Sequence, residues 1–439
     1  MKTHSRRDFL KTTAGIAAGG ALGESLLTAE AATPQLSFKP EAGAKLRVLR
    51  WKRFVQGDED AWMANTKKFS EVTGIEVRVD NENWEDIRPK AAVAASVGSG
   101  PDIILSTNDD SHQYPDRLLD VSDLCDYLGE KYGPWYPSAL AYGRNGNRWI
   151  AVPLGSGGNC MNYRESHLKA AGFKEFPRDT AGFLKLCQAL KQNGTPPGFA
   201  LGNATGDANG WCHWLLWAFG GKMVDENNKV AINSKETAAA LEFARQLYPT
   251  FISGTLSWLD PNNNKAFLSG DISLTNNGIS IYYAAKNSAD PKVKALAADI
   301  QHANFPIGPV GHATESALFF TSMVYKYTKY PNAAKEYLRF MMEKEQYEPW
   351  QKAAIGFVTQ PLTYYESNPV WTADPKNTPF KFSCKNMLPN GHAGKLGTAS
   401  AGCMADFIVV NMVAEAATES VSVADAMKRA ERRAQRYYG

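Results

Sequence analysis

Polar and aromatic side chains follow two predicted strands at the points where those strands end. Residues 45–51 form the first strand and lead through Trp51 into Lys52 and Arg53, and residues 101–105 lead into the polar run 106–110. Ligands of open parallel sheets gather just beyond the carboxyl ends of the strands. We therefore expect the two runs to lie together at one binding edge.

The elements that must position these runs are recognisable around them. An amphipathic helix over 59–72 ends at Thr73-Gly74, and residues 75–79 alternate as a second strand. A helix over 87–97 then precedes the strand at 101–105. This β-α-β opening is typical of an α/β domain with a parallel sheet and right-handed crossovers.

The stretch 145–164 predicts a hinge. Residues 149–152 form a short apolar strand that Pro153 is expected to end, and a Gly/Ser run follows before a second ordered segment. Glycine reaches backbone angles closed to other residues, so such a run suits a moving connection. Because 439 residues exceed what one core usually holds, we interpret the stretch as the first crossing between two α/β lobes that clamp a ligand.

The N-terminus is typical of a twin-arginine export signal. Arg6-Arg7 is followed by Phe9-Leu10-Lys11, and Ala29-x-Ala31 offers the small residues that a signal peptidase needs. We expect cleavage after Ala31, so that the signal spans residues 1–31. The apolar stretch is short and interrupted by Glu24, which favours a soluble periplasmic protein over a membrane anchor.

Composition and spacing argue against several function classes. The net charge of +3 falls to +2 without the signal, which holds four basic and three acidic residues, and such a balance does not suit a nucleic-acid binder. The six cysteines and seven histidines show no metal-ligand spacing, and the Gly/Ser run lacks the Gly-Lys-Ser/Thr of a P-loop. We therefore expect neither metal nor other cofactor. Cys384 and Cys403 could form a disulfide in the periplasm or remain free thiols.

An ordered set of short motifs carries a resemblance to a known family. The matching pieces are Trp51; Phe69-x-x-x-Thr73-Gly74-Ile75-x-Val77; Pro101-Asp102-Ile103; Val152-Pro153 with Tyr163; Ala266-Phe267-x-x-Gly270 with Asn277-Gly278; and Asn332-Ala333-Ala334-x-x-Tyr337-Leu338-x-Phe340-Met341. Their order and spacing over some three hundred residues resemble the extracellular solute-binding proteins of ABC importers, in the carbohydrate-binding, maltose-binding-protein-like branch.

The resemblance implies a two-lobe periplasmic-binding-protein fold with three crossings between the lobes. It implies a ligand held in the cleft, no catalysis, and delivery of the ligand to membrane permease subunits by what we expect to be a monomer. On this basis the N-terminal lobe comprises 32–155 with 276–317, and the C-terminal lobe comprises 156–275 with 318–439. The second crossing is then expected near 274–277 and the third near 317–320.

Sugars present apolar C–H faces and close-set hydroxyls, so their sites pair aromatic rings with carboxylates and amides. The candidate ligand-binding residues are Trp51, Trp84, Asn108, Asp109, Asn203, Asp207, Trp211, Trp214, Asn277, Tyr282, Gly356 and Phe357. Asp109 matches a sugar-contacting aspartate of the family but also suits a helix N-cap. Trp211 and Trp214 share a helical face, which more often indicates packing.

Three departures from the maltose-type pattern argue against a maltose-like ligand: Arg164 after Tyr163, Ser280 in place of a stacking tryptophan, and Ser106 in place of an aromatic residue. Lys52 and Arg53 leave open an anionic sugar derivative, and Asp109 with Asp110 leaves open a polyamine. An exported enzyme is the alternative from another class, although the sequence carries no nucleophile elbow or dinucleotide fingerprint.

Overall fold

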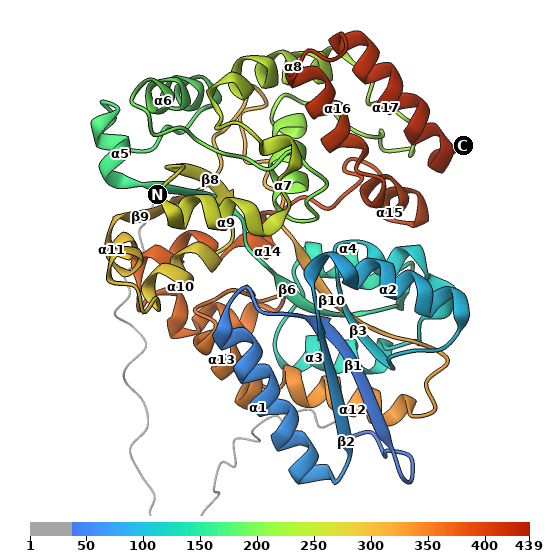
Figure 1. Cartoon of the computed structure of the whole chain (residues 1–439). Coiled ribbons are helices and arrows are strands. Elements are labelled where there is room, and N and C mark those ends of the chain that lie inside the picture. The colour runs from blue at the N-terminus through green and yellow to red at the C-terminus, as the bar shows by residue number, and fades with distance from the viewer. Residues whose placement is uncertain (1–36) are drawn as a thin grey trace, which may run out of the picture. The chain divides into compact units, whose positions relative to one another are not determined.

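The computed structural model describes residues 37–439. The predicted export signal and its cleavage position after Ala31 lie outside the described residues. Figure 1 shows two groups of helices and strands, which we call the first and second lobes after the sheet on which each is built.

The first lobe is built on a five-stranded sheet of order β2-β1-β3-β10-β6. The strands are β1 (Lys45–Trp51), β2 (Glu76–Glu82), β3 (Ile103–Thr107), β10 (Phe319–Val324) and β6 (Val152–Ser156). The first three are parallel, as the β-α-β pattern predicted, whereas β10 runs antiparallel between β3 and β6. Pro153 lies inside β6 and does not end it, because an edge strand has one side without ladder partners and tolerates the missing N–H.

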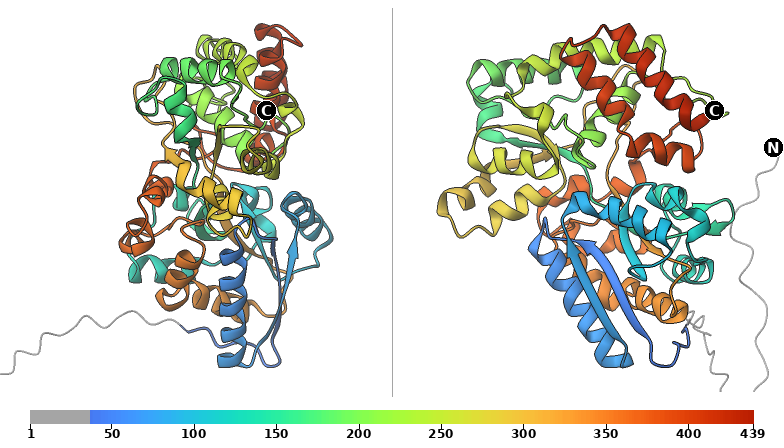
Figure 2. Two further views of the ribbon diagram at one scale, coloured as in Figure 1. Left: turned by 60° about the vertical axis from the view of Figure 1, so that its left-hand side comes forward. Right: turned by 45° about the vertical axis from the view of Figure 1, so that its right-hand side comes forward.

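Helices cover both faces of this sheet. On one face α1 (Gln56–Thr73) packs against α12 (Pro331–Met342) and α13 (Lys344–Ala353), and α2 (Trp84–Val97) packs on the other, as Figure 2 shows. Between α12 and α13 the chain turns at Glu343, whose carboxylate accepts hydrogen bonds from Tyr127, Lys131 and Arg339. The lobe also contains α3 (Ser122–Lys131), α4 (Pro137–Gly143), α14 (Ser383–Asn386) and the hairpin of β4 (Arg144–Asn145) and β5 (Arg148–Trp149).

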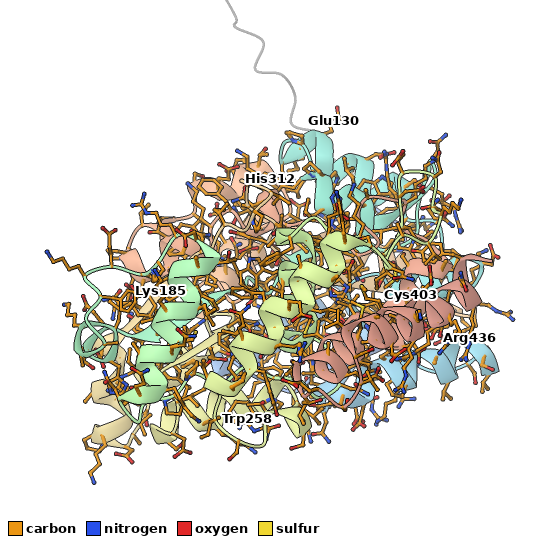
Figure 3. The ribbon with its side chains drawn as sticks, turned by 90° about the horizontal axis from the view of Figure 1, so that it is seen from above. Glu130, Lys185, Trp258, His312, Cys403 and Arg436 are labelled. Carbon is orange, nitrogen blue, oxygen red and sulfur yellow. The ribbon has the colours of Figure 1, made fainter. Side chains whose placement is uncertain are left out.

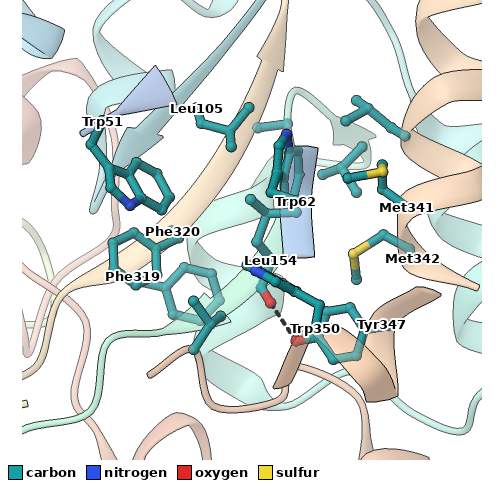
Figure 4. Packing of buried hydrophobic residues seen from close by; sticks show 14 of the residues in the cluster. Trp51, Trp62, Leu105, Leu154, Phe319, Phe320, Met341, Met342, Tyr347 and Trp350 are labelled. Carbon is teal, nitrogen blue, oxygen red and sulfur yellow. Dashed lines mark hydrogen bonds between the residues drawn. The ribbon is translucent and has the colours of Figure 1, made fainter. Parts of the chain in front are cut away.

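A buried ion pair lies at the centre of the first lobe. The Nη2 atom of Arg50 is 2.5 Å from Oδ2 of Asp58, and both side chains are fully buried. The indole N–H groups of Trp51 and Trp350 donate to the same carboxylate, at 3.1 and 2.8 Å. Figure 4 shows Trp51, Trp350 and their apolar neighbours in this core. One carboxylate therefore joins β1, α1 and α13.

The second lobe is built on a three-stranded antiparallel sheet of order β8-β7-β9, formed by β8 (Leu274–Asn277), β7 (Cys160–Arg164) and β9 (Ile300–Ala303). Its apolar core lies among helices, chiefly α7 (Asp207–Ala218), α8 (Lys235–Leu247), α16 (Ile408–Ala417) and α17 (Val423–Tyr438). The remaining helices of this lobe are α5 (Glu165–Ala170), α6 (Thr180–Gln192) and α15 (Thr398–Ala405). Helices α9 (Asp260–Ser269), α10 (Ser280–Lys286) and α11 (Pro291–Asp299) lie close to this sheet in the chain, but the buried residues Phe267, Ile281 and Ala285 belong to the apolar core of the first lobe.

The C-terminal helices belong to the core of this lobe. Figure 3 views them from above, with Arg436 on α17 and Cys403 on α15. The stretch Thr398–Ala417 is long and apolar enough for a membrane span by length and composition, but 56% of its window is buried and a left-handed Phe407 divides it into α15 and α16. Ser422 caps α17 by accepting a hydrogen bond from the backbone N–H of Asp425.

The chain crosses between the two sheets at places that only partly match expectation. The first crossing, Gly157–Asn159 between β6 and β7, falls within the predicted hinge stretch. No crossing lies at residues 274–277, because β8 pairs with β7 inside the second sheet. The passage from β9 to β10 brings the chain back near residue 318, and a further crossing follows Met387, after which Leu388 packs on the second core.

The expected partition of the lobes is corrected accordingly. Residues 319–324 form β10 in the first sheet, and residues 300–303 form β9 in the second, which reverses the assignment of both segments. The disulfide left open between Cys384 and Cys403 is not formed. Cys384 lies in the first core beside Thr359, Cys403 lies in the second core, and both thiols are free.

Replacing Asp58 by Asn should destabilise the protein by about 3–5 kcal/mol, because the Arg50 cation would remain buried without its partner charge. Chemical denaturation of the two proteins measures this difference. Asp60→Asn, on the exposed side of α1, is the matched control and should change stability by no more than about 0.5 kcal/mol. Equal stabilities for the two variants would contradict the central role of the ion pair.

Candidate functional site

A cavity lies where the first crossing meets both lobes. Its empty volume is about 470 Å³, part of it open to solvent. The lining residues are Phe54, Trp84, Gly157, Gly158, Asn159, Gly206, Asp207, Asp260, Asn264, Asn277, Gly278, Ser280, Leu318, Phe320 and Phe357.

The first lobe supplies an aromatic wall, which consists of Phe54, Trp84, Phe320 and Phe357. Trp84 meets Phe54 and Phe320 edge to face, with ring centroids 5.6 and 6.0 Å apart. Behind them Trp51 stacks on Phe320 at 4.7 Å and meets the edge of Trp84 at 5.5 Å. Because Trp51 is held by Asp58, the wall rests on the buried ion pair of the core.

The second lobe supplies a polar wall that begins with two carboxylates. Asp260, the first residue of α9, accepts hydrogen bonds from the backbone N–H groups of Gly206 and Asp207 at 2.8–3.1 Å. These N–H groups begin α7, where free donors and the helix dipole favour an anion. Asp207 accepts from Nδ2 of Asn263 through Oδ2 at 2.8 Å, and Asn276 donates to its backbone carbonyl at 3.1 Å.

Burial raises the pKa of both carboxyl groups. The pKa of Asp207 lies well above its ordinary value, because of burial and the neighbouring Asp260 charge. The pKa of Asp260 is also raised by burial, an effect that the N–H groups of Asp207 and Gly206 offset. The indole N–H of Trp84 is turned toward Asp260, is buried, and has no hydrogen-bond partner among the described residues.

Amides and a hydroxyl complete the polar wall. Asn277 at the end of β8 donates to Oδ1 of Asn264, and Asn264 donates to Oγ of Ser280 at 2.9 Å. Ser280 in turn donates to Oδ1 of Asn277 at 3.0 Å. Each member is held in orientation by the other two, so the set presents fixed donors and acceptors to the cavity.

This arrangement suits recognition of a small molecule that has both apolar faces and hydroxyl groups. Aromatic rings pack on C–H faces, and carboxylates and amides bond to hydroxyls. Among the described residues there is no group of three or more His, Cys, Asp or Glu that could hold a metal ion.

Comparison with known families identifies the chain. Residues 64–379 match the bacterial extracellular solute-binding proteins, and this match covers more than half of the sequence. The chain belongs to this family. Residues 3–23 match the twin-arginine translocation signal, so this solute-binding protein is exported from the cytoplasm. No curated protein sequence matches it.

Solved structures show that the solute-binding protein has the two-lobe fold of its family. Maltose-bound MalE3 of T. maritima superposes with a TM-score of 0.75 at 19% identity, covering 89% of this chain and 99% of that one. A sugar transporter protein from Arthrobacter chlorophenolicus A6 with bound laminaribiose gives 0.77 at 17%, covering 90% and 99%. The GacH receptor of Streptomyces glaucescens gives 0.74 at 18%, covering 90% and 98%.

Four residues proposed from the sequence of this solute-binding protein line the cavity: Trp84, Asp207, Asn277 and Phe357. Sequence reasoning missed Phe54, Asp260, Asn264 and Phe320. Asp260 carried one usable signal, since Leu259-Asp260-Pro261 is a helix-start pattern. That pattern shows where α9 begins and leaves unknown which loop its carboxylate holds.

The other three tryptophans proposed for the ligand are core residues, which corrects those predictions. Trp51 is fully buried behind the wall. Trp211 is 1% exposed and donates to the carbonyl of Ala200 at 2.7 Å, and Trp214 donates to that of Pro306 at 3.0 Å. The α7 face that they share meets the aromatic core of the second lobe, so packing explains the periodicity.

Four further candidates lie outside the cavity lining. Asn108 has a left-handed backbone, and its side chain accepts from the N–H of Phe319 at 3.0 Å. Asn203 is exposed on its loop. Tyr282 donates to Asp374 at 2.5 Å. Gly356, with φ of 81°, forms a turn against Trp371, where a Cβ atom would lie 2.4 Å from the ring.

Asp109 also lies outside this lining, at a contact between the first lobe and the segment after Met387. Its Oδ1 atom accepts from Nδ2 of Asn390 at 3.1 Å, and its Oδ2 atom has no partner among the described residues. Burial, reinforced by the neighbouring charge of Asp110, raises its pKa to about 6. Arg88 opposes the shift but is 2.7 Å from Asp110.

Asp109→Asn should stabilise the protein at neutral pH by about 3 kcal/mol. The folded protein keeps the Asp109 proton up to about pH 6, whereas the unfolded chain releases it near the ordinary pKa of 3.8. The carboxylate therefore disfavours folding increasingly as pH rises between these two values, and fully above them. Denaturation at several pH values measures the gain, which should vanish in acid.

The exposed Asp116→Asn variant is the control, and it should show no such pH-dependent gain. A stability difference for Asp109→Asn that stays constant between about pH 3.5 and 7.5 would contradict the assignment.

Proposed function

We propose that this solute-binding protein captures a carbohydrate in the cavity between its lobes and delivers it to the permease of a membrane ABC transporter. The observation that best supports this proposal is that two chemically different walls face each other. Aromatic rings of the first lobe face carboxylates, amides and a hydroxyl of the second lobe across one cavity. A sugar ring needs both kinds of contact at once.

Capture then proceeds by closure of two lobes, for which we propose boundaries that follow the two sheets. By their sheets, the first lobe comprises residues 37–156 and 318–387, and the second comprises 157–317 and 388–439, with buried side chains of residues 279–300 packed in the first core. A ligand shifts the balance between open and closed forms only as far as it binds the closed form better. Because each wall belongs to a different lobe, a sugar in the cavity makes its full set of contacts only when the lobes are together.

The ligands of structurally similar proteins support a carbohydrate. The compared structures carry maltose, laminaribiose, acarbose and α-D-tagatose, which range from one sugar ring to several. Ser106 and Ser280 stand where maltose-type proteins have aromatic residues, so we propose a carbohydrate other than a maltose-like one. We further propose that the protein acts as a monomer, binds no nucleic acid and catalyses no reaction.

Trp84→Ala should weaken carbohydrate binding about tenfold or more, because it removes a ring contact worth about 1.4 kcal/mol. A thermal-shift screen of sugars, together with mass spectrometry of any co-purified molecule, would supply the ligand, and calorimetry would give both affinities. Tyr364→Ala deletes an exposed ring remote from the cavity and should leave the affinity unchanged. Equal affinities for Trp84→Ala and the parent protein would contradict the aromatic wall.

A further inference from the structure

The charge of the cavity is one-sided. Its lining within the described residues includes two carboxylates, Asp207 and Asp260, and no lysine, arginine or histidine. A neutral sugar needs hydrogen-bonding groups and places no requirement on the sign of the charge around it. Two acids in the lining without an opposing cation therefore favour a ligand that carries a positive charge.

The two carboxylates differ in what they already bind. Asp260 is held by the N–H groups at the beginning of α7, and the Trp84 indole N–H is also turned toward it. Asp207 has one side-chain partner, Asn263 on Oδ2, while its Oδ1 atom receives no hydrogen bond from the described residues. The structure thus satisfies Asp260 from within and leaves Asp207 open to the cavity.

An ionised Asp207 is poorly stabilised in the empty cavity. Burial and the Asp260 charge both oppose its ionisation and raise its pKa well above the ordinary value. A neutral hydroxyl would offer it one hydrogen bond and leave the repulsion in place. A ligand cation would add an attraction that offsets the repulsion between Asp207 and Asp260, and it would donate a charge-assisted hydrogen bond to Asp207.

The opposite wall also favours a cation. Trp84, Phe54, Phe320 and Phe357 line the same cavity, and aromatic faces attract ammonium groups, tryptophan most strongly. The ring that suits a sugar's C–H face therefore also suits a positive charge attached to that sugar. Asn264, Asn277 and Ser280 remain for the hydroxyl groups.

We propose that the ligand is an aminated sugar, whose ammonium group binds Asp207 beside the aromatic wall while its hydroxyls bind the Asn264, Asn277 and Ser280 set. This inference rests on the proposed carbohydrate function and specifies its substrate class. It makes Asp207 the residue that determines specificity for the charged group.

Matched sugar sets test it. Glucosamine, glucose and N-acetylglucosamine differ only in carrying an amine, a hydroxyl or a neutral amide at one carbon, and the galacto and manno series repeat the comparison. Thermal shift and calorimetry at about pH 6 keep the amine protonated. We expect at least one amine to bind about tenfold or more tightly than both of its neutral counterparts.

The Asp207→Asn variant should lose this preference, so that amine and neutral sugar bind within about threefold of each other. Asp271→Asn, an exposed acid of the same lobe, should keep it. Neutral sugars that bind as tightly as their amines in the parent protein would overturn the inference and leave the carbohydrate function standing. Binding of a polyamine such as putrescine, with no binding of mono- or oligosaccharides in the wider thermal-shift screen, would overturn both.

Discussion

The buried pair of Arg50 and Asp58 is the interaction on which the binding architecture depends. Asp58 accepts from Arg50, Trp51 and Trp350, so a single carboxylate fixes a strand, the helix after it and a helix almost three hundred residues later. Trp51 cannot turn without breaking that bond, and it forms the back of the aromatic wall. The order of the cavity's rings is therefore set in the core of the first lobe. The buried charges do not contact the ligand, but they determine the position of the aromatic wall that does.

The two lobes divide recognition between them. The first lobe offers rings whose orientation comes from packing, and the second offers carboxylates and amides whose orientation comes from mutual hydrogen bonds. They meet at a crossing that must stay small: a Cβ atom on Gly158, which has φ of 63°, would lie 2.8 Å from Phe380. Each wall is rigid within its own lobe, so adaptation to a ligand falls on the spacing between the walls.

The sequence predicted local structure and family well, and the site only in part. Strands β1–β3 follow from alternation and from glycine at helix ends, which depend on near neighbours. The sequence period also predicts that Trp211 and Trp214 share one face of α7. It does not reveal whether that face meets a core or a cleft. Asp260 meets Gly206 across 54 residues, and β10 enters the first sheet between strands distant in sequence. Such pairings follow from the assembled fold, which the local sequence pattern does not contain.

Asn159 gives the connection between the lobes a further property. It lies in the first crossing, and its Nδ2 atom donates to the carbonyl of Ser316, in the segment that leads to the second crossing, at 2.9 Å, while Asn276 donates to its Oδ1 atom at 3.3 Å. Two connecting segments of the chain are thus hydrogen-bonded to each other side by side. Closure of the lobes would therefore move these two segments together, which limits the closing motion to directions that both segments can follow.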